Sequence, residues 1–267
     1  MSGAGLWCCV MFWLGCSFRD RCMVDKNCAG QVFYAIDTDD CDRAKSLALA
    51  VMGWVGGVKL GVEFFSANGP AGVDVLRRIG LPVFLDLKLF DIPNTVAGAI
   101  AASAHCQPAM ITLHASGGGA MMRTAVEANQ KVAEESGNVR PLLLGVTVLT
   151  SFNRDDLSET GVYSTVVEQV SRLAELAQAS GLDGVVCSAH EIEILRSVCG
   201  EEFKLVVPGI RPTWARSDDQ KRVLTPGEAV ARGADYLVIG RPISCADDPA
   251  AAARRISAEI ADATVMA

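Results

Sequence analysis

The sequence lacks a surplus of positive charge. Its 267 residues include 24 lysines and arginines against 31 aspartates and glutamates, which gives a formal net charge of −7. Proteins that bind nucleic acid or an anionic membrane through their overall field carry the opposite excess. We therefore expect neither nucleic acid nor a membrane as a partner, and any bound anion must be held by a few local basic groups.

The cysteines lack the spacing of a disulfide or zinc framework. Five of the ten lie in the first 28 residues and the others are scattered, no C-x-x-C pair occurs, and the chain has only 3 histidines. Secreted disulfide scaffolds and structural zinc sites need regular pairs. We expect no metal and no cofactor, and the reducing cytoplasm as the location.

A long apolar run is also missing. The apolar segment 6–14 reads LWCCVMFWL, far short of the roughly 20 residues of a membrane helix. No basic residue precedes it, as a signal peptide requires. We expect residues 1–29 to be an N-terminal extension, either disordered or the result of a start assigned too early with Met23 as the true initiator. Residues 30–267 are then one domain, a usual length for an α/β barrel.

From residue 31 onward, short apolar segments alternate with longer helical ones. The predicted strands are residues 32–36, 57–60, 82–87, 110–113, 142–148, 184–186, 204–207 and 236–239. The predicted helices are residues 40–51, 73–79, 95–103, 120–135, 162–179, 191–198, 226–232 and 249–260. Eight strand–helix units predict an α/β fold, a single-domain (β/α)8 TIM barrel. The rival, a doubly wound sheet, needs a glycine-rich turn after the first strand, where this chain reads Asp-Thr-Asp-Asp.

The segment 82–95, PVFLDLKLFDIPNT, places charges at the end of an apolar strand. Alternation puts Asp86 and Lys88 on one face of that strand, and Asp91 follows. A surface ion pair is the simplest interpretation and contributes little. The flanking leucines instead indicate a buried strand, where unpaired charge is costly, so we interpret the segment as a catalytic array.

Polar residues also end other predicted strands. They are Asp37, Lys59, His114, Thr147, Thr150, Arg211 and Arg241. In a barrel the strand ends converge on the face that carries active sites. A phosphate site is predicted at Arg211, after the seventh strand, and at Gly240 and Arg241, after the eighth. The loops after these two strands are the usual phosphate position in this fold. The long polar segment 213–224 has the features of a lid.

These motifs in this order resemble bacterial orotidine 5'-phosphate decarboxylases. The resemblance rests on DLKLFDIPNT (86–95), AID (35–37), KLG (59–61), VTVLTS (146–151) and PGIRP (208–212), and covers roughly residues 31–260. It implies decarboxylation of orotidine 5'-monophosphate to uridine 5'-monophosphate in pyrimidine synthesis, by a homodimer with shared active sites and no cofactor.

The resemblance also assigns roles. Lys88 is expected to protonate the pyrimidine C6, Asp86 to face the substrate carboxylate, and Lys59 to hold Asp86 and a ribose hydroxyl. The remaining substrate-binding residues are expected to be Asp37 at the ribose, Asp91, Ile92 and Thr95 in the neighbouring subunit's site, Thr150 at the pyrimidine, Gln220 on the lid, and Arg211, Gly240 and Arg241 at the phosphate.

Three alternatives remain at this stage. A metal-dependent sugar-phosphate decarboxylase or aldolase of the same superfamily shares the D-x-K-x-x-D motif, but places a glutamate ligand where this chain has Lys59. A phosphosugar isomerase or epimerase is disfavoured because His114 and His190 lack acid–base partners in the sequence, and His114 fits a packed strand end. A non-catalytic phosphoribosyl-binding scaffold would have no use for a buried charged array.

Overall fold

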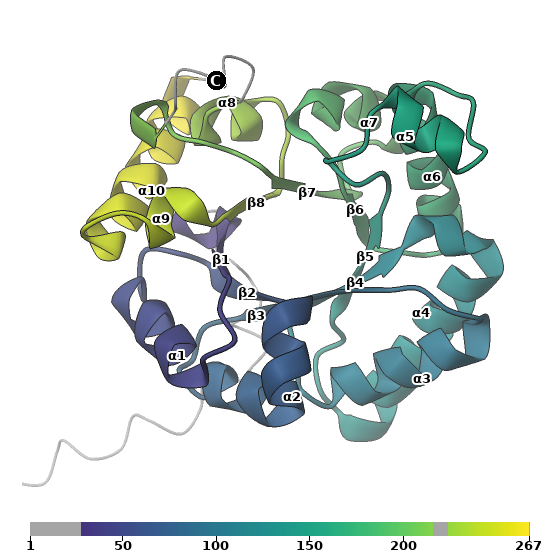
Figure 1. Cartoon of the computed structure of the whole chain (residues 1–267), viewed down its shortest axis with the longest axis horizontal. Coiled ribbons are helices and arrows are strands. Elements are labelled where there is room, and N and C mark those ends of the chain that lie inside the picture. The colour runs from purple at the N-terminus through teal and green to yellow at the C-terminus, as the bar shows by residue number, and fades with distance from the viewer. Residues whose placement is uncertain (1–27, 216–223, 267) are drawn as a thin grey trace, which may run out of the picture.

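In the computed structural model, which describes residues 28–215 and 224–266, parallel strands close on themselves in chain order (Figure 1). The strands are β1 Val32–Ile36, β2 Gly57–Gly61, β3 Val83–Leu89, β4 Met110–His114, β5 Leu142–Val146, β6 Gly184–Val186, β7 Lys204–Pro208 and β8 Tyr236–Ile239. The pairing of Tyr34 in β1 with Ile239 in β8 completes the ring. The predicted TIM barrel is confirmed, and the open doubly wound sheet is excluded.

Helices surround the barrel on its outer side (Figure 1). They are α1 Cys41–Ala50, α2 Val62–Arg77, α3 Pro93–Ala104, α4 Gly118–Ser136, α5 Arg154–Glu159, α6 Val166–Ala179, α7 Ile192–Cys199, α8 Pro226–Ala231, α9 Arg241–Ser244 and α10 Pro249–Met266, with short 3-10 turns η1 Cys28–Gln31, η2 Ala115–Gly117, η3 Ala189–Glu191 and η4 Thr213–Ala215. Two starts follow from local chemistry. The Asp40 carboxylate accepts from the amides of Asp42 and Arg43, and Thr225 forms a capping box with Glu228. No helix within these described ranges has the length and apolar character needed to span a bilayer.

The core has two layers because alternate strand residues point to opposite faces. A small inner cluster fills the barrel: Phe33, Ala35, Phe84, Met110, Leu144, Val206 and Val238. Their neighbours in sequence, such as Tyr34, Leu85 and Ile111, point outward into the larger core under the helices. Inward-facing positions nearer the carboxyl ends of the strands are polar. The barrel is therefore apolar in its interior and polar at this end, which we call its mouth.

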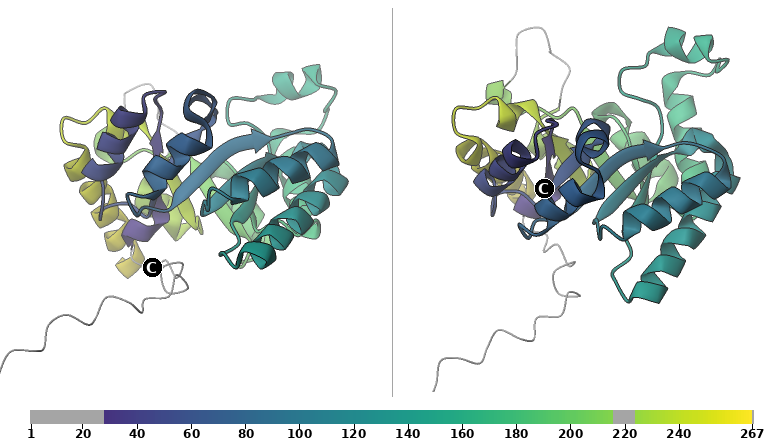
Figure 2. Two further views of the ribbon diagram at one scale, coloured as in Figure 1. Left: turned by 90° about the horizontal axis from the view of Figure 1, so that it is seen from below. Right: turned by 60° about the horizontal axis from the view of Figure 1, so that its bottom comes forward.

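The opposite end of the barrel is held by ion pairs at strand starts. Asp183 pairs with Arg140 and also accepts from the amide of Leu143 at 2.8 Å. Asp235 pairs with Arg196 and accepts from the amide of Leu205 at 2.8 Å. Each carboxylate therefore joins the start of one strand to its neighbour. Figure 2 shows α5 standing above the other end, where the carboxyl ends of the strands lie.

Two predicted helices were wrong in extent. The expected helix 73–79 is the second part of α2, which begins at Val62 and kinks at Gly69, where φ is +57° and Pro70 follows. The prediction began the helix three residues after Pro70, although proline suits a first helical turn. The expected helix 162–179 is α6, which begins only at Val166 because Thr165 caps it, and the separate short helix α5, capped by Asn153, was not predicted. The prediction for residues 1–29 falls almost wholly on residues 1–27, outside the described residues.

Candidate active site

Three charged side chains meet at the mouth of the barrel. The Lys88 Nζ lies 2.8 Å from Asp86 Oδ2 and the Lys59 Nζ lies 3.3 Å from the same oxygen. The side chains of Lys59 and Asp86 are each 12% exposed and that of Lys88 is 35% exposed. Two ammonium groups thus share one carboxylate oxygen in a largely buried position. The pair of Asp86 and Lys88 is therefore not the surface ion pair considered in the sequence analysis.

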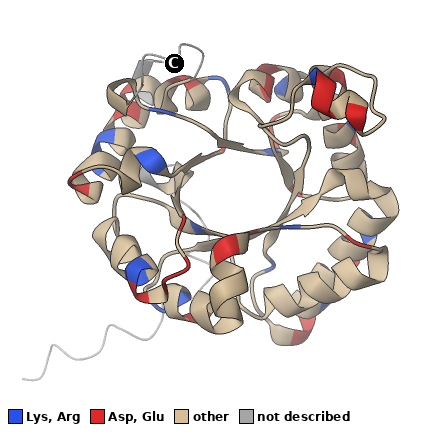
Figure 3. Ribbon diagram, viewed as in Figure 1, with Lys and Arg blue, Asp and Glu red and all other residues tan. Residues whose placement is uncertain are grey.

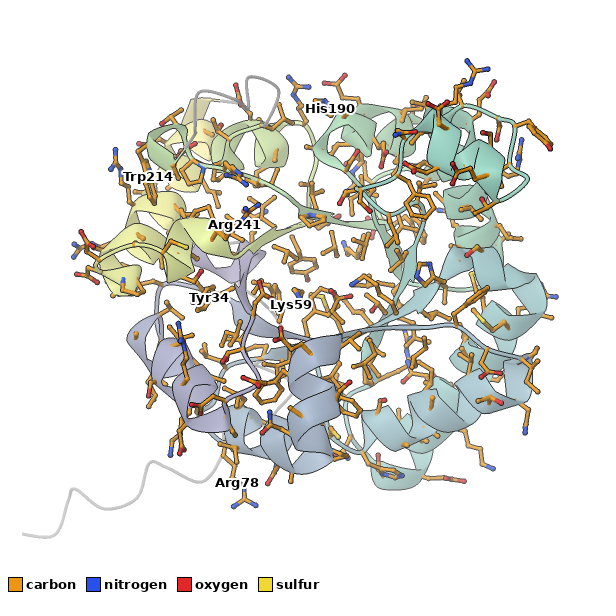
Figure 4. The ribbon with its side chains drawn as sticks, in the orientation of Figure 1. Tyr34, Lys59, Arg78, His190, Trp214 and Arg241 are labelled. Carbon is orange, nitrogen blue, oxygen red and sulfur yellow. The ribbon has the colours of Figure 1, made fainter. Side chains whose placement is uncertain are left out.

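The register of the barrel explains why Lys59 and Asp86 meet. Lys59 lies beside Phe84, and Gly61 beside Asp86, across the β2–β3 pair. Phe84 is an inner-cluster residue, so Asp86, two positions later, also faces the barrel axis. In Figure 4 Lys59 lies near the centre of the ring of strands, and Figure 3 shows both signs of charge around that ring.

Thr112 is part of this site and was not predicted from the sequence. Its hydroxyl donates to Asp86 Oδ1 at 3.0 Å and accepts from the Lys88 amide at 2.9 Å. Threonine is common in buried strands, so MITLH gives no obvious signal. Only its position in the strand could have indicated a role. Thr112 shares the inward face of β4 with Met110 and lies at the level of the charged cluster.

The cluster controls the ionisation of Asp86. Burial alone would raise the pKa of this carboxyl, but the charges of Lys59 and Lys88, with hydrogen bonds from Lys88 and Thr112, hold the pKa below its usual value. Asp86 is therefore a carboxylate at neutral pH, held beside two ammonium groups. The cluster of Lys59, Asp86 and Lys88 carries one surplus positive charge, which suits an anionic ligand.

His114 ends β4 next to the cluster. Burial and the charge of Lys88 lower its pKa, with Asp86 acting in the opposite direction. Its ring packs edge-on against Phe90, with centroids 5.8 Å apart. This agrees with the expectation of a packed strand-end residue.

The predicted phosphate and ribose residues lie around the same mouth. Gly240 follows β8 and precedes Arg241, the first residue of α9. The Asp37 Oδ2 lies 3.5 Å from the position a Gly240 side chain would start from, so the ends of β1 and β8 are adjacent. Arg211 follows β7, half-buried, and its amide donates to the Leu224 carbonyl. Figure 4 shows Arg241 on the side of the ring near β8.

Other predicted residues stand apart from the charged cluster. Asp91, Ile92 and Thr95 lie at the exposed start of α3, and the Asp91 Oδ1 accepts from the Ile92 amide at 2.6 Å. Over residues 28–215 and 224–266, Asp91 forms no ion pair with Lys88. Thr150 lies exposed in the turn after β5. Gln220 lies outside the described residues.

The donor set around Asp86 does not suit a divalent cation. Two of its neighbours are ammonium groups, which repel a cation, whereas such ions need several oxygen ligands. Searched over the described ranges, His, Cys, Asp and Glu side chains form no group of three or more that could hold a metal.

Comparison with known proteins agrees with these features. A sequence model of the Orotidine 5'-phosphate decarboxylase / HUMPS family matches residues 30–256. The chain is 53% identical to orotidine 5'-phosphate decarboxylase of Paramagnetospirillum magneticum over 86% of this chain and 97% of that protein. It is 55% identical to the Rhodospirillum rubrum enzyme of the same name, over 86% and 93%. The crystal structure of Lactobacillus acidophilus orotidine 5'-phosphate decarboxylase is 37% identical with a TM-score of 0.77, covering 86% of this chain and 98% of that one.

Proposed function

This chain belongs to the Orotidine 5'-phosphate decarboxylase / HUMPS family, and from this premise we propose that it decarboxylates orotidine 5'-monophosphate to uridine 5'-monophosphate and CO2. The observation that carries the proposal is the Lys59–Asp86–Lys88 cluster. It is a carboxylate flanked by two ammonium groups, at the end of the barrel that carries active sites in this fold. Within the superfamily, Lys59 separates this activity from that of the metal-dependent relatives, which use a glutamate there.

Lys88 is the proposed proton donor. When the C6–carboxylate bond breaks, the electron pair stays on C6 as an sp² carbanion with no adjacent carbonyl to accept it. An ammonium group fixed beside that carbon stabilises the charge as it develops. Its proton then passes to C6, and the neutral amine recovers a proton from water. No cofactor is needed for this sequence.

Asp86 supports the same step from the other side. Its carboxylate faces the substrate carboxylate and favours departure of CO2, and Lys59 keeps Asp86 ionised and oriented. Asp37 and Lys59 are proposed to bind the ribose hydroxyls, and Thr150 the pyrimidine.

The phosphate is proposed to bind at Arg211, Gly240 and Arg241, with Gln220 completing the site. An arginine fork grips phosphate oxygens in two places. Binding energy from this remote group can be used to order the site around C6.

We further propose a homodimer with shared sites. Phe90 and Ile92 are 63% and 66% exposed, and such apolar side chains beside an active site favour a protein contact. Asp91 lies between them, its carboxylate directed to its own backbone rather than to Lys88. A partner subunit on this surface would receive Asp91, Ile92 and Thr95.

We also propose that the enzyme works in the cytoplasm, which the unpaired state of the described cysteines supports.

The test is turnover of orotidine 5'-monophosphate by the full chain and by Lys88→Ala. We expect the wild type to form uridine 5'-monophosphate, and Lys88→Ala to lose activity while still binding the product, because a transition-state interaction is lost. Lys131→Ala, which changes an exposed lysine that pairs with Glu135 at 3.8 Å, is the matched control and should be unaffected. No turnover by the wild type would overturn the function, and Lys88→Ala with more than about a tenth of wild-type kcat would overturn the role of Lys88.

A further inference from the structure

One hydroxyl group connects the backbone and the carboxylate of the charged cluster. Thr112 is fully buried, and its Oγ1 donates to Asp86 Oδ1 at 3.0 Å while accepting from the Lys88 amide at 2.9 Å. A hydroxyl can perform both roles at once because it has one donor and two acceptor positions. Asp86 thus has Thr112 on one oxygen and the two lysines on the other.

The backbone at Lys88 explains why such a contact is needed. Between β3 and β4, Leu85 lies beside Ile111 but Leu89 lies beside Leu113. An advance of four residues along β3 thus corresponds to an advance of two residues along β4, which makes this part of β3 a bulge. Lys88 within this bulge has a φ of +50°, a left-handed conformation that is unfavourable for residues other than glycine. A bulge re-aims a side chain and interrupts the ladder. The Lys88 amide has lost a strand partner, and the Thr112 hydroxyl replaces it.

We propose that Thr112 is a positioning residue for the decarboxylation, one that holds the Lys88 backbone in its left-handed conformation and fixes the Asp86 carboxylate. Its two hydrogen bonds keep the Lys88 ammonium and the Asp86 carboxylate in one arrangement relative to the substrate. Thr112 itself contacts neither of the reacting atoms. This inference rests on the proposed function for its kinetic consequences, whereas the two hydrogen bonds of Thr112 are observed in the structure itself.

The substitution Thr112→Val tests the hydrogen bonds of the Thr112 side chain separately from its packing. Thr112→Val has nearly the same volume but neither donates nor accepts, so the Lys88 amide and one Asp86 oxygen lose their buried partner. Thr112→Ser keeps the hydroxyl and loses only a methyl group. A residue needed merely for packing would show the reverse order of effects.

The kinetic experiment compares wild type, Thr112→Val and Thr112→Ser. We expect kcat to fall about 10- to 100-fold in Thr112→Val, because the Lys88 amide and one Asp86 oxygen are left without their buried partner. KM should change much less, because the phosphate contacts are untouched. Thr112→Ser should remain within about threefold of wild type. Thr165→Val, which removes the side-chain cap that Thr165 forms with Glu168 at the start of α6, controls for a general loss of stability.

A second readout does not depend on turnover. The groups facing Asp86 are Lys59 on β2, Lys88 on β3, and Thr112 and His114 on β4. Loss of the Thr112 hydrogen bond should raise the pKa of Asp86 in Thr112→Val and leave it unchanged in Thr112→Ser, as followed by NMR of the Asp86 carboxyl. This comparison stands even if the wild type fails to decarboxylate the nucleotide, so the two proposals can fail separately.

The proposal is overturned if Thr112→Val retains kcat within about threefold of the Thr165→Val control. It is equally overturned if Thr112→Ser is as impaired as Thr112→Val, or if the Asp86 titration is the same in all variants. If Thr112→Val does not fold, Thr112→Ala provides the same comparison against Thr112→Ser.

Discussion

Removal of the Lys59 charge tests the electrostatic account of the site most directly. In Lys59→Met the side-chain stem remains and the ammonium group disappears. At 3.3 Å from the Asp86 oxygen, that charge contributes an attraction of about 5 kcal/mol with an effective dielectric constant of about 20. The net effect is smaller because Lys88 and Thr112 still contact Asp86 and because the cost of burying Lys59 is also removed.

We expect the pKa of Asp86 to rise in Lys59→Met, because the opposite charge beside the carboxylate is removed. In the wild type this pKa is lowered, so the carboxylate stabilises the fold above the ordinary carboxyl pKa of about 4, and that stabilisation disappears as the pH falls through the folded-state value. In the variant the folded-state pKa lies closer to the unfolded-state value, so this stabilisation is smaller and its loss is complete at a higher pH. Breaking a buried pair should also reduce kcat/KM by about 100- to 10,000-fold, equivalent to about 3–5 kcal/mol.

The measurements are the pH dependence of kcat/KM and of thermal unfolding. Lys131→Met is the matched control, since that lysine is 73% exposed and its ion pair lies on the surface of α4. Using the same substrate for all variants removes the titration of the substrate phosphate from the comparison. The electrostatic account is refuted if the acid limb of Lys59→Met coincides with those of the wild type and the control.

Three further outcomes are expected. Activity should survive exhaustive EDTA treatment, because Lys59 occupies the place of a ligand beside Asp86, and loss of activity restored by Mg²⁺ would favour a metal-dependent relative. Arg241→Ala should raise KM strongly for the nucleotide and leave turnover of orotidine, which lacks the phosphate, unchanged, since a charged hydrogen bond is lost; equal effects on both substrates would make Arg241 structural. Inactive Asp91→Ala and Lys88→Ala chains should regain about one quarter of wild-type activity when their subunits exchange at random, because half of the dimers are hybrids with one intact site each, and no recovery despite proven exchange would place Asp91 in its own subunit's site.

The charged part of the site could be predicted because of its chemistry. Asp86 and Lys88 interrupt an otherwise apolar strand, and a parallel barrel brings the carboxyl end of every strand to one face, so Lys59, from another strand, could be placed on that face. That Lys59 contacts Asp86 was implied by the family resemblance alone. The structure confirms these contacts. The roles of the groups in turnover remain predictions.

The positioning part of the site could not be predicted in the same way. Thr112 is a usual strand residue, and its importance depends on a bulge in the neighbouring strand. That bulge has no glycine to indicate it, because the left-handed residue is Lys88 itself. Simple alternation along β3 places Lys88 correctly near Asp86 but gives no account of the backbone that carries it there.

The break in α2 shows a related limit. Glycine followed by proline usually marks a turn, and here Gly69 does leave helical geometry. The chain nevertheless continues into a second helical segment at Pro70, because tertiary packing buries Phe64 before the break and Val73 and Leu76 after it. Packing of this kind is invisible in a local sequence window.

The closure of the ring between β1 and β8 has a consequence for how the chain folds. Val32–Ile36 pairs on one side with β2 and on the other with Tyr236–Ile239. The second edge of the first strand therefore stays unpaired until the last strand has been formed. During synthesis from the amino end, β1 and the most recent strand present open edges that can pair with another chain. The entropy of closing so long a loop grows only slowly with length, so late closure slows folding more than it reduces the final stability. A nascent or truncated chain ending before β8 is therefore expected to be the species most prone to aggregate.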